Sequence, residues 1–223
     1  MTTPITTERL EKLRRLVQNR QQDVVLVLED IHDPHNAEAA FRSCDAFGIQ
    51  TVHLIFEQQS PFNPRKVGKS TSSSANKWLD FITHRTTQSA IDQLKQEGYT
   101  SVATTLRDDA ISIFDIDFKP GKWAIWIGNE HRGLSDRAQV QCEMAIKIPM
   151  AGLVQSLNLS VTAALIMYEI TRQRVASGTD FKLDTDQQSL LLESIISRTR
   201  RVKTPPKIAA GSVPTLGKFG SDE

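Results

Sequence analysis

A loop at residues 149–158 combines residue types that bind ligands through side chains and through free backbone amides. It contains Met150, Gly152, Gln155, Ser156 and Asn158. The segment before it, residues 144–148, is short and largely apolar, which is typical of a strand buried on both faces. After it, apolar residues recur at helical spacing, and Asn158 or Ser160 is placed to cap the helix. In open α/β sheets such strand-to-helix loops meet ligands, whereas the alternative is an ordinary turn whose polar side chains only satisfy the backbone.

A second candidate loop follows the five aliphatic residues 24–28, which are typical of a central parallel strand. Pro34 is expected to exclude helix, so Asn36 is predicted to cap a helix over residues 37–47. Arg42 lies six residues after Asn36 in the same helix. Considered alone, a capping Asn and a helical Arg are commonplace, and a structural role is the simpler interpretation.

A third loop follows another apolar segment, residues 123–127, and reads Gly-Asn-Glu-His-Arg-Gly from Gly128. Its glycine spacing does not indicate a dinucleotide-binding turn, because Glu130 and His131 occupy positions that such a turn keeps small. Ser135 or Asp136 is predicted to cap a short helix after the loop.

These loops require strands and helices that alternate along the chain. Strands are expected over residues 24–28, 51–56, 79–83, 99–106, 123–127 and 144–148. Helices are expected over residues 7–20, 37–47, 87–97 and 137–142, from 157 to the Ser177-Gly178 break, and over 185–197. Such alternation predicts an α/β fold with a mainly parallel sheet flanked by helices.

The three loops together resemble the three motifs of the SpoU/TrmH branch of the SPOUT RNA 2'-O-ribose methyltransferases. The first is Pro-His-Asn-x-x-x-x-x-Arg-x-Cys-Asp-x-x-Gly from residue 34, and the second is Gly-x-Glu-x-x-Gly from residue 128. The third is Ile-Pro-Met-x-Gly-x-x-x-Ser-Leu-Asn-x-Ser from residue 148. The resemblance implies a SPOUT fold with a C-terminal trefoil knot and S-adenosylmethionine as methyl donor.

The resemblance also implies roles for individual residues. Its cofactor-binding positions correspond to Thr104, Gly128, Ile148 and Leu157. Its catalytic and RNA-contacting positions correspond to Arg42, Asn36, Glu130, Ser156 and Asn158. A guanidinium does not lose its proton at neutral pH, so Arg42 is expected to stabilise the developing alkoxide, with water or phosphate taking the proton. Transfer from a sulfonium needs positioning and handling of one proton, and no metal is expected.

The layout, with a short basic N-terminal helix and a helix after the third motif, is similar to that of TrmH-type members. This similarity implies a tRNA substrate methylated at the D-loop guanosine of position eighteen, and a homodimer. A ribosomal-RNA ribose methyltransferase of the same fold would keep every motif. A non-catalytic RNA-binding homologue is the alternative from a different class of protein.

The net charge of +1 gives no general nucleic-acid signature, so RNA-binding surfaces must come from local basic clusters. Residues 63–70 are one glycine short of a phosphate-binding P-loop, and Pro64 spoils the amide cradle. Basic residues there, in the first helix and near the C-terminus are predicted to contact RNA, with solvated surface charge as the alternative. The predicted contacts are Arg9, Arg14, Arg15, Arg65, Lys69, Arg198, Arg200 and Arg201.

Four segments are expected: a basic N-terminal extension (1–22), the methyltransferase domain (23–175), a helical extension (176–197) and a basic flexible tail (198–223). Cys44 and Cys142 lie in expected helices without disulfide or metal-ligand spacing, which suits a reducing compartment. No apolar segment approaches the roughly 20 residues that cross a bilayer, and no signal sequence is recognisable. A cytoplasmic location is therefore expected.

Overall fold

The strands of the protein form one parallel sheet. The computed structural model describes residues 5–67, 75–119, 121–178 and 180–201, without the side chains of Arg200 and Arg201. The strand order is β3-β2-β1-β6-β4-β7-β5, and all neighbouring strands pair in parallel. The strands are β1 (Gln21–Glu29), β2 (Ile49–Ile55), β3 (Asp80–His84), β4 (Thr100–Thr104), β5 (Ile111–Ser112), β6 (Trp123–Ile127) and β7 (Met144–Lys147). The predicted parallel α/β sheet is confirmed, and the trefoil knot stays a prediction.

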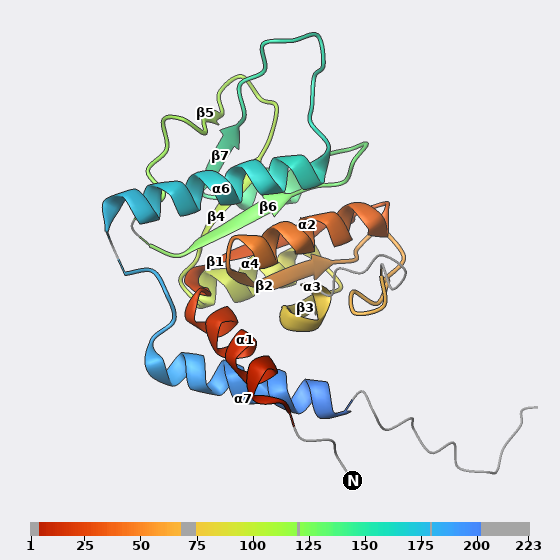
Figure 1. Cartoon of the computed structure of the whole chain (residues 1–223). Coiled ribbons are helices and arrows are strands. Elements are labelled where there is room, and N and C mark those ends of the chain that lie inside the picture. Colours follow the sequence, from red (N-terminus) through yellow and green to blue (C-terminus); the bar gives the residue numbers. More distant parts are fainter. Residues whose placement is uncertain (1–4, 68–74, 120, 179, 202–223) are drawn as a thin grey trace, which may run out of the picture.

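Helices cover both faces of this sheet (Figure 1). They are α1 (Thr7–Gln18), α2 (Pro34–Ala46), α3 (Ala75–Trp78), α4 (Thr87–Gln96), α5 (Asp136–Gln141), α6 (Leu159–Ser177) and α7 (Thr185–Arg201). Helices α2 and α6 share one hydrophobic core with the sheet, and α4 and α5 form a second core on the opposite face. The functional loops therefore emerge from a sheet that is held rigid on both sides.

The depth of each strand follows its place in the sheet. Residues 24–28 of β1 and all of β6 are buried, as their uninterrupted apolar sequences predict. The prediction that residues 144–148 are buried on both faces is wrong, because only Ile146 of β7 is buried. The physical reason is position: β7 lies next to the edge, and its outer neighbour β5 has only two residues.

Helix α2 begins earlier than predicted. Asp33, not Asn36, is the N-cap, and its side chain accepts a hydrogen bond from the backbone N–H of His35 at 2.9 Å. Pro34 occupies the first turn, where its missing N–H costs nothing and its fixed φ suits the helix. This frees the Asn36 side chain from capping.

Helices α1 and α7 pack on each other beside the main domain (Figure 1). Their shared core contains Leu13, Val17 and Ile195. Helix α7 continues to Arg201, past residue 197 where the sequence predicts its end. Arg20, at the end of the helix predicted over residues 7–20, lies beyond α1, is buried and pairs with Asp45 at 2.6 Å.

The helix caps and the two cysteines lie close to their predicted places. Ser135 caps α5 and Asn158 caps α6, each an expected alternative, and Thr6 caps α1. Cys44 is buried in α2, whereas Cys142 directly follows α5 instead of lying inside it. In the part of the chain that the structure describes, no helix combines the length and apolarity needed to cross a bilayer.

Two histidines form a stacked pair inside the second core. His53 of β2 and His84 of β3 are buried, with rings 5.2 Å apart at 9° and His53 Nδ1 3.0 Å from His84 Nε2. Burial and the neighbouring His84 lower the pKa of His53 to about 4, and burial also lowers the pKa of His84. Folding therefore favours the neutral form of both imidazoles.

Acidification is expected to destabilise the fold through His53. Its folded-state pKa of about 4 lies below the unfolded value of about 6.5, so the unfolded chain binds the extra proton. Stability is complete above about pH 6.5 and falls as the pH drops toward 4, by about 2 kcal/mol between pH 7.5 and 5. Urea unfolding of wild type and His53→Gln at both pH values measures this. An equal pH dependence in the two proteins would contradict it.

Candidate active site

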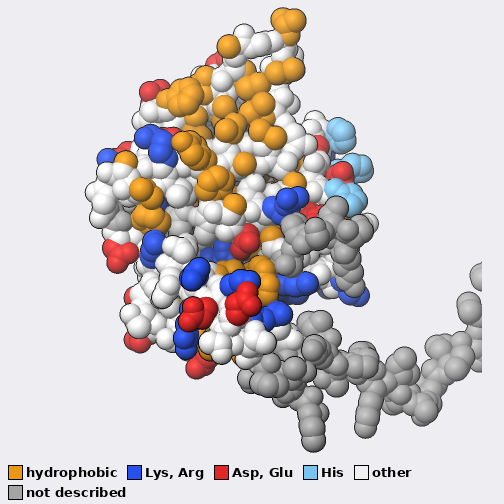
Figure 2. Space-filling model, viewed as in Figure 1, with side chains coloured by type: hydrophobic (Ala, Val, Ile, Leu, Met, Phe, Trp, Pro, Cys, Tyr) orange, Lys and Arg blue, Asp and Glu red, His pale blue; other side chains and the backbone are white. Residues whose placement is uncertain are grey.

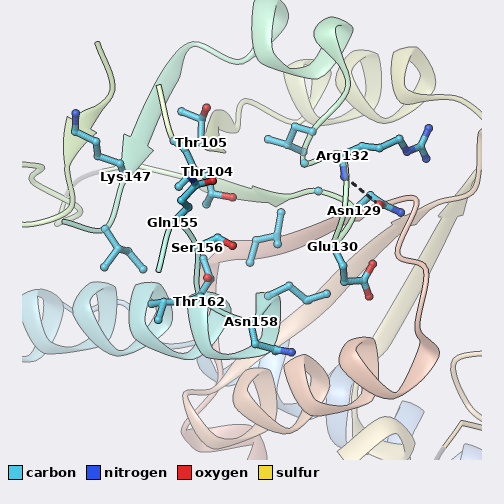
Figure 3. A pocket seen from close by; sticks show the side chains of 18 of the residues that line it. Thr104, Thr105, Asn129, Glu130, Arg132, Lys147, Gln155, Ser156, Asn158 and Thr162 are labelled. Carbon is cyan, nitrogen blue, oxygen red and sulfur yellow. Dashed lines mark hydrogen bonds between the residues drawn. The ribbon is translucent and has the colours of Figure 1, made fainter. Parts of the chain in front are cut away.

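A cavity of about 670 Å³ opens at the carboxyl ends of β4, β6 and β7. The loop 149–158 and the first turns of α6 close its other side (Figure 3). Its walls combine apolar side chains, such as Ile146, Ile148 and Ile166, with polar groups. In Figure 3, Gln155 and Ser156 lie beside Thr104. This composition suits a ligand with both apolar and polar parts.

The turn after β6 is held tightly against its own strand. Asn129 and Gly133 exchange two backbone hydrogen bonds of 3.0 and 2.8 Å, which fold the chain back at residues 129–133. A Cβ atom on Gly128 would lie 2.1 Å from the Gly133 carbonyl carbon and 2.2 Å from the Leu134 nitrogen. Only glycine fits at residue 128 while this turn keeps its shape.

A hydrogen-bonded network joins the three predicted motifs at the mouth of the cavity. Asn36 Nδ2 donates to Glu130 Oε1 at 3.0 Å, and Asn158 Nδ2 donates to Asn36 Oδ1 at 3.0 Å. Asn158 Oδ1 in turn accepts from the backbone N–H of Ser160 at the start of α6, at 2.8 Å. Because the Asn36 amide is bound at both ends, its orientation is fixed.

Glu130 is the centre of this network. Besides the bond from Asn36, its carboxylate accepts the backbone N–H of His32 at 2.8 Å and that of Asp33 at 3.1 Å. Burial acts to raise the pKa of Glu130, but the bonds from Asn36, His32 and Asp33 hold it below its ordinary value. Glu130 is thus an ionised anchor that ties the turn after β6 to the start of α2, and it is a poor proton acceptor.

Most predicted site residues meet in this cavity. All four predicted cofactor-binding residues line it: Thr104, Gly128, Ile148 and Leu157. Four of the five predicted catalytic residues also line it: Asn36, Glu130, Ser156 and Asn158. Arg42 is not among the lining residues and is exposed on α2, which packs against α6. Its side chain makes no hydrogen bond or ion pair with another described residue.

The predicted RNA-binding residues fall into three groups. Arg9, Arg14 and Arg15 are exposed on α1. Arg65 and Arg198 both donate to the backbone carbonyl of Leu79, and Arg198 also pairs with Asp80 at 2.8 Å. These two residues therefore hold the structure together around the start of β3. Lys69 lies outside the described residues, as do the side chains of Arg200 and Arg201.

Two residues that sequence reasoning did not single out also shape the site. Asn129 is buried, donates to the carbonyl of Asp30 at 2.7 Å and accepts the backbone N–H groups of His131 and Arg132. Asp30 has a φ of 51°, and its carboxylate accepts three successive backbone N–H groups from residues 57–59. The available signal was an acidic residue directly after a buried strand, because such residues often bind nearby amides.

Comparison with known proteins identifies the family. The family model described as the SpoU rRNA Methylase family matches residues 23–168. The chain belongs to this family. The matched region contains all three loops and the whole network around Glu130. The resemblance found in the motifs is therefore confirmed.

Individual relatives agree with this assignment. The tRNA (guanosine(18)-2'-O)-methyltransferase of Thermus thermophilus is 38% identical over 174 residues, which cover 78% of this chain and 87% of the relative. The solved TrmH/SpoU tRNA modifying enzyme of A. aeolicus is 26% identical, with a TM-score of 0.76 over 86% of this chain and 96% of that one. The SpoU methyltransferase AviRb of Streptomyces viridochromogenes, solved with AdoMet, has a TM-score of 0.62 at 26% identity and covers 73% of this chain and 62% of that one.

Proposed function

We propose that this protein transfers a methyl group from S-adenosylmethionine to the 2'-hydroxyl of a ribose in RNA, at guanosine 18 of the tRNA D-loop. The observation that carries the proposal is the network of Glu130, Asn36 and Asn158 at the mouth of the cavity. It fixes amide groups at one point where a ribose and a cofactor would meet. Membership of the SpoU family and the tRNA-modifying relative support the reaction and the RNA.

The cavity fits the proposed cofactor. A volume of about 670 Å³ accommodates a nucleoside with an amino-acid side arm, within the usual range for small-molecule sites. Ile148 and Leu157 supply apolar walls, and Gly128 allows the turn at residues 129–133 to pack against its own strand at the edge of the cavity. When bound, S-adenosylmethionine supplies an electrophilic methyl group on a sulfonium. We assign its binding to these residues together with Thr104.

The side chains at the mouth of the cavity position the ribose and stabilise the charge that develops on its 2'-oxygen. Glu130 holds Asn36, and Asn36 holds Asn158, so the second N–H of each amide points in a set direction. Ser156 forms no hydrogen bond with another described residue, which leaves its hydroxyl available to the ribose. Because its hydrogen bonds hold the pKa of Glu130 below its ordinary value, Glu130 is a poor base, and the hydroxyl proton goes to water or to an RNA phosphate, with Arg42 stabilising the alkoxide.

Incubation with labelled S-adenosylmethionine and unmodified tRNA tests the function, with the modified nucleotide mapped by mass spectrometry. One 2'-O-methyl group at guanosine 18 is expected, and a tRNA with another base at that position tests the dependence on guanosine. Methylation of ribosomal RNA instead would overturn the tRNA assignment and keep the reaction. If well-folded protein fails to bind S-adenosylhomocysteine in calorimetry, the whole proposal is wrong.

We also propose that the protein is a homodimer that pairs through α6. Val161, Leu165, Tyr168 and Val175 form an exposed apolar stripe on this helix. Of the three consecutive residues 165–167, Leu165 faces outward whereas Ile166 and Met167 are buried. Figure 2 shows hydrophobic side chains gathered over α6 and above it, where Phe114, Leu153 and Val154 are exposed. Contiguous exposed apolar surface of this kind marks an interaction site, and we expect it to pack against the same helix of a second copy.

The dimer should dissociate when a charge enters this stripe. We expect light scattering at micromolar concentration to give twice the 25.0 kDa of one chain for wild type and the single-chain mass for Leu165→Asp. The cause is the cost of burying an unpaired carboxylate in an apolar interface. Val140→Asp is the matched control, because Val140 is 80% exposed on α5, which packs on the opposite face of the sheet. A monomeric wild type would contradict the dimer.

A further inference from the structure

The exposed histidines of this protein gather in one place. The chain has five histidines, and two of them, His53 and His84, are buried. The other three, His32, His35 and His131, are exposed. Figure 2 shows the exposed imidazoles as a single group on one edge of the molecule. They come from the loop before α2, the first turn of α2 and the turn after β6, which are the segments that Glu130 ties together.

Together with Arg132, the three side chains form a rim beside the cavity, in which two of the imidazoles are in contact. The rings of His32 and His131 meet edge to face, with centroids 5.5 Å apart. His35 is 79% exposed, and its Nδ1 lies 3.9 Å from Glu38 Oε2. Arg132 lies next to His131 and also lines the cavity, with a side chain 48% exposed.

The carboxylates that face this rim are already engaged. Glu130 accepts three hydrogen bonds, and Asp33 accepts the backbone N–H of His35. Asp30 accepts three backbone N–H groups and lies 3.9 Å from Arg132. Glu38 is nearly buried under His35. Arg132 Nη1 also donates to Gln58 Oε1. The rings of His32 and His131 make no hydrogen bond or ion pair with another described residue, so their N–H groups remain available for an anion from solution.

A ribose at the mouth of the cavity brings its two neighbouring phosphates with it. Phosphates are bound by cations, and a net charge of +1 over the whole chain makes local cations decisive. Arg132 contributes a guanidinium to the rim, and an imidazole gains a positive charge when it binds a proton. Among the described residues, no group of three or more histidine, cysteine, aspartate or glutamate side chains is arranged to hold a metal ion.

We propose that His32, His35 and His131, together with Arg132, bind a backbone phosphate of the RNA next to the target ribose, and bind it more tightly when the imidazoles are protonated. The inference rests on the proposed function, because it takes RNA as the ligand. Burial lowers the pKa of His53 and that of His84 and raises the pKa of Cys142 to about 12, so burial moves all three groups away from neutral pH.

The test measures binding of unmodified tRNA by fluorescence anisotropy, with saturating S-adenosylhomocysteine, at pH 6 and pH 8 and fixed ionic strength. Wild type is expected to bind on the order of ten-fold more tightly at pH 6, because up to three cations are added near phosphates. His32→Gln combined with His35→Gln removes two rings that do not line the cavity, and should reduce this ratio to about two-fold. At pH 6 the double variant should release about one counterion fewer than wild type on binding tRNA, which makes its affinity less dependent on salt concentration.

Lys95→Gln on α4 is the matched control and should keep the wild-type ratio, because Lys95 is exposed on the opposite face of the sheet. An unchanged pH ratio in the double variant would overturn the inference. An equal loss of affinity at both pH values would also overturn it, since it would indicate stacking of the rings on bases. If tRNA is neither bound nor methylated by wild type, the proposed function fails. If wild type methylates tRNA normally but binds it equally well at pH 6 and pH 8, only the proposed phosphate site is wrong.

Discussion

Replacing Gly128 with alanine is expected to abolish cofactor binding. The added Cβ would lie 2.1 to 2.3 Å from the backbone of Gly133 and Leu134, and backbone atoms in a hydrogen-bonded turn have no room to yield. The turn must open, and the carboxylate of Glu130 must then leave its three donors. Overpacking of this kind costs about 1–3 kcal/mol of stability. Calorimetry with S-adenosylhomocysteine and urea unfolding measure the two effects.

Gly152→Ala provides the control for this prediction. Gly152 lies in the loop on the other side of the cavity, and a Cβ there meets no atom within 4 Å. The stability of the Gly152→Ala variant should therefore match that of wild type. The account of the turn is wrong if Gly128→Ala unfolds at the same urea concentration as wild type and binds S-adenosylhomocysteine with the same affinity.

The sequence was sufficient to predict six of the seven strands and the location of the site, but not the two-residue strand β5. Uninterrupted apolar segments mark β1 and β6, and polar residues after buried strands mark the edge where ligands bind, because both signals are local. The burial of a strand depends on its neighbours in the sheet. The burial of β7 was therefore overestimated, because nothing within residues 144–148 reveals that its outer neighbour has only two residues.

The hydrogen-bonded network at the mouth of the cavity could not be predicted from local sequence either, because its members are far apart in the chain. Asn36 was interpreted as a cap, because a capping Asn and an Asn that bridges two distant loops have the same local sequence. Its partners, Glu130 and Asn158, are 94 and 122 residues away in the chain. Only the resemblance of three separated motifs indicated that these residues meet. The role of Arg65 was similarly hidden, since its bond to Leu79 depends on how a long loop folds back.

Arg42→Ala is expected to lower the rate of methyl transfer by about 10²–10³, the usual loss when one donor to a developing oxyanion is removed. Arg42 does not line the cavity and makes no contact with another described charge, so the affinity for S-adenosylhomocysteine should stay at the wild-type value. The exposed guanidinium on α2 would act only when RNA is bound across the mouth. Single-turnover methylation at saturating tRNA and calorimetry separate the two quantities.

Two further variants sharpen this prediction. Arg42→Lys keeps the positive charge but not the planar fork, so it should recover little activity if the guanidinium binds two oxygens at once. Arg85→Ala removes an equally exposed arginine after β3, at the far edge of the sheet from the cavity, and should leave the rate unchanged. A near-native rate for Arg42→Ala would show that Arg42 is an ordinary surface residue. The alkoxide would then be stabilised by the amides of Asn36 and Asn158 and the hydroxyl of Ser156.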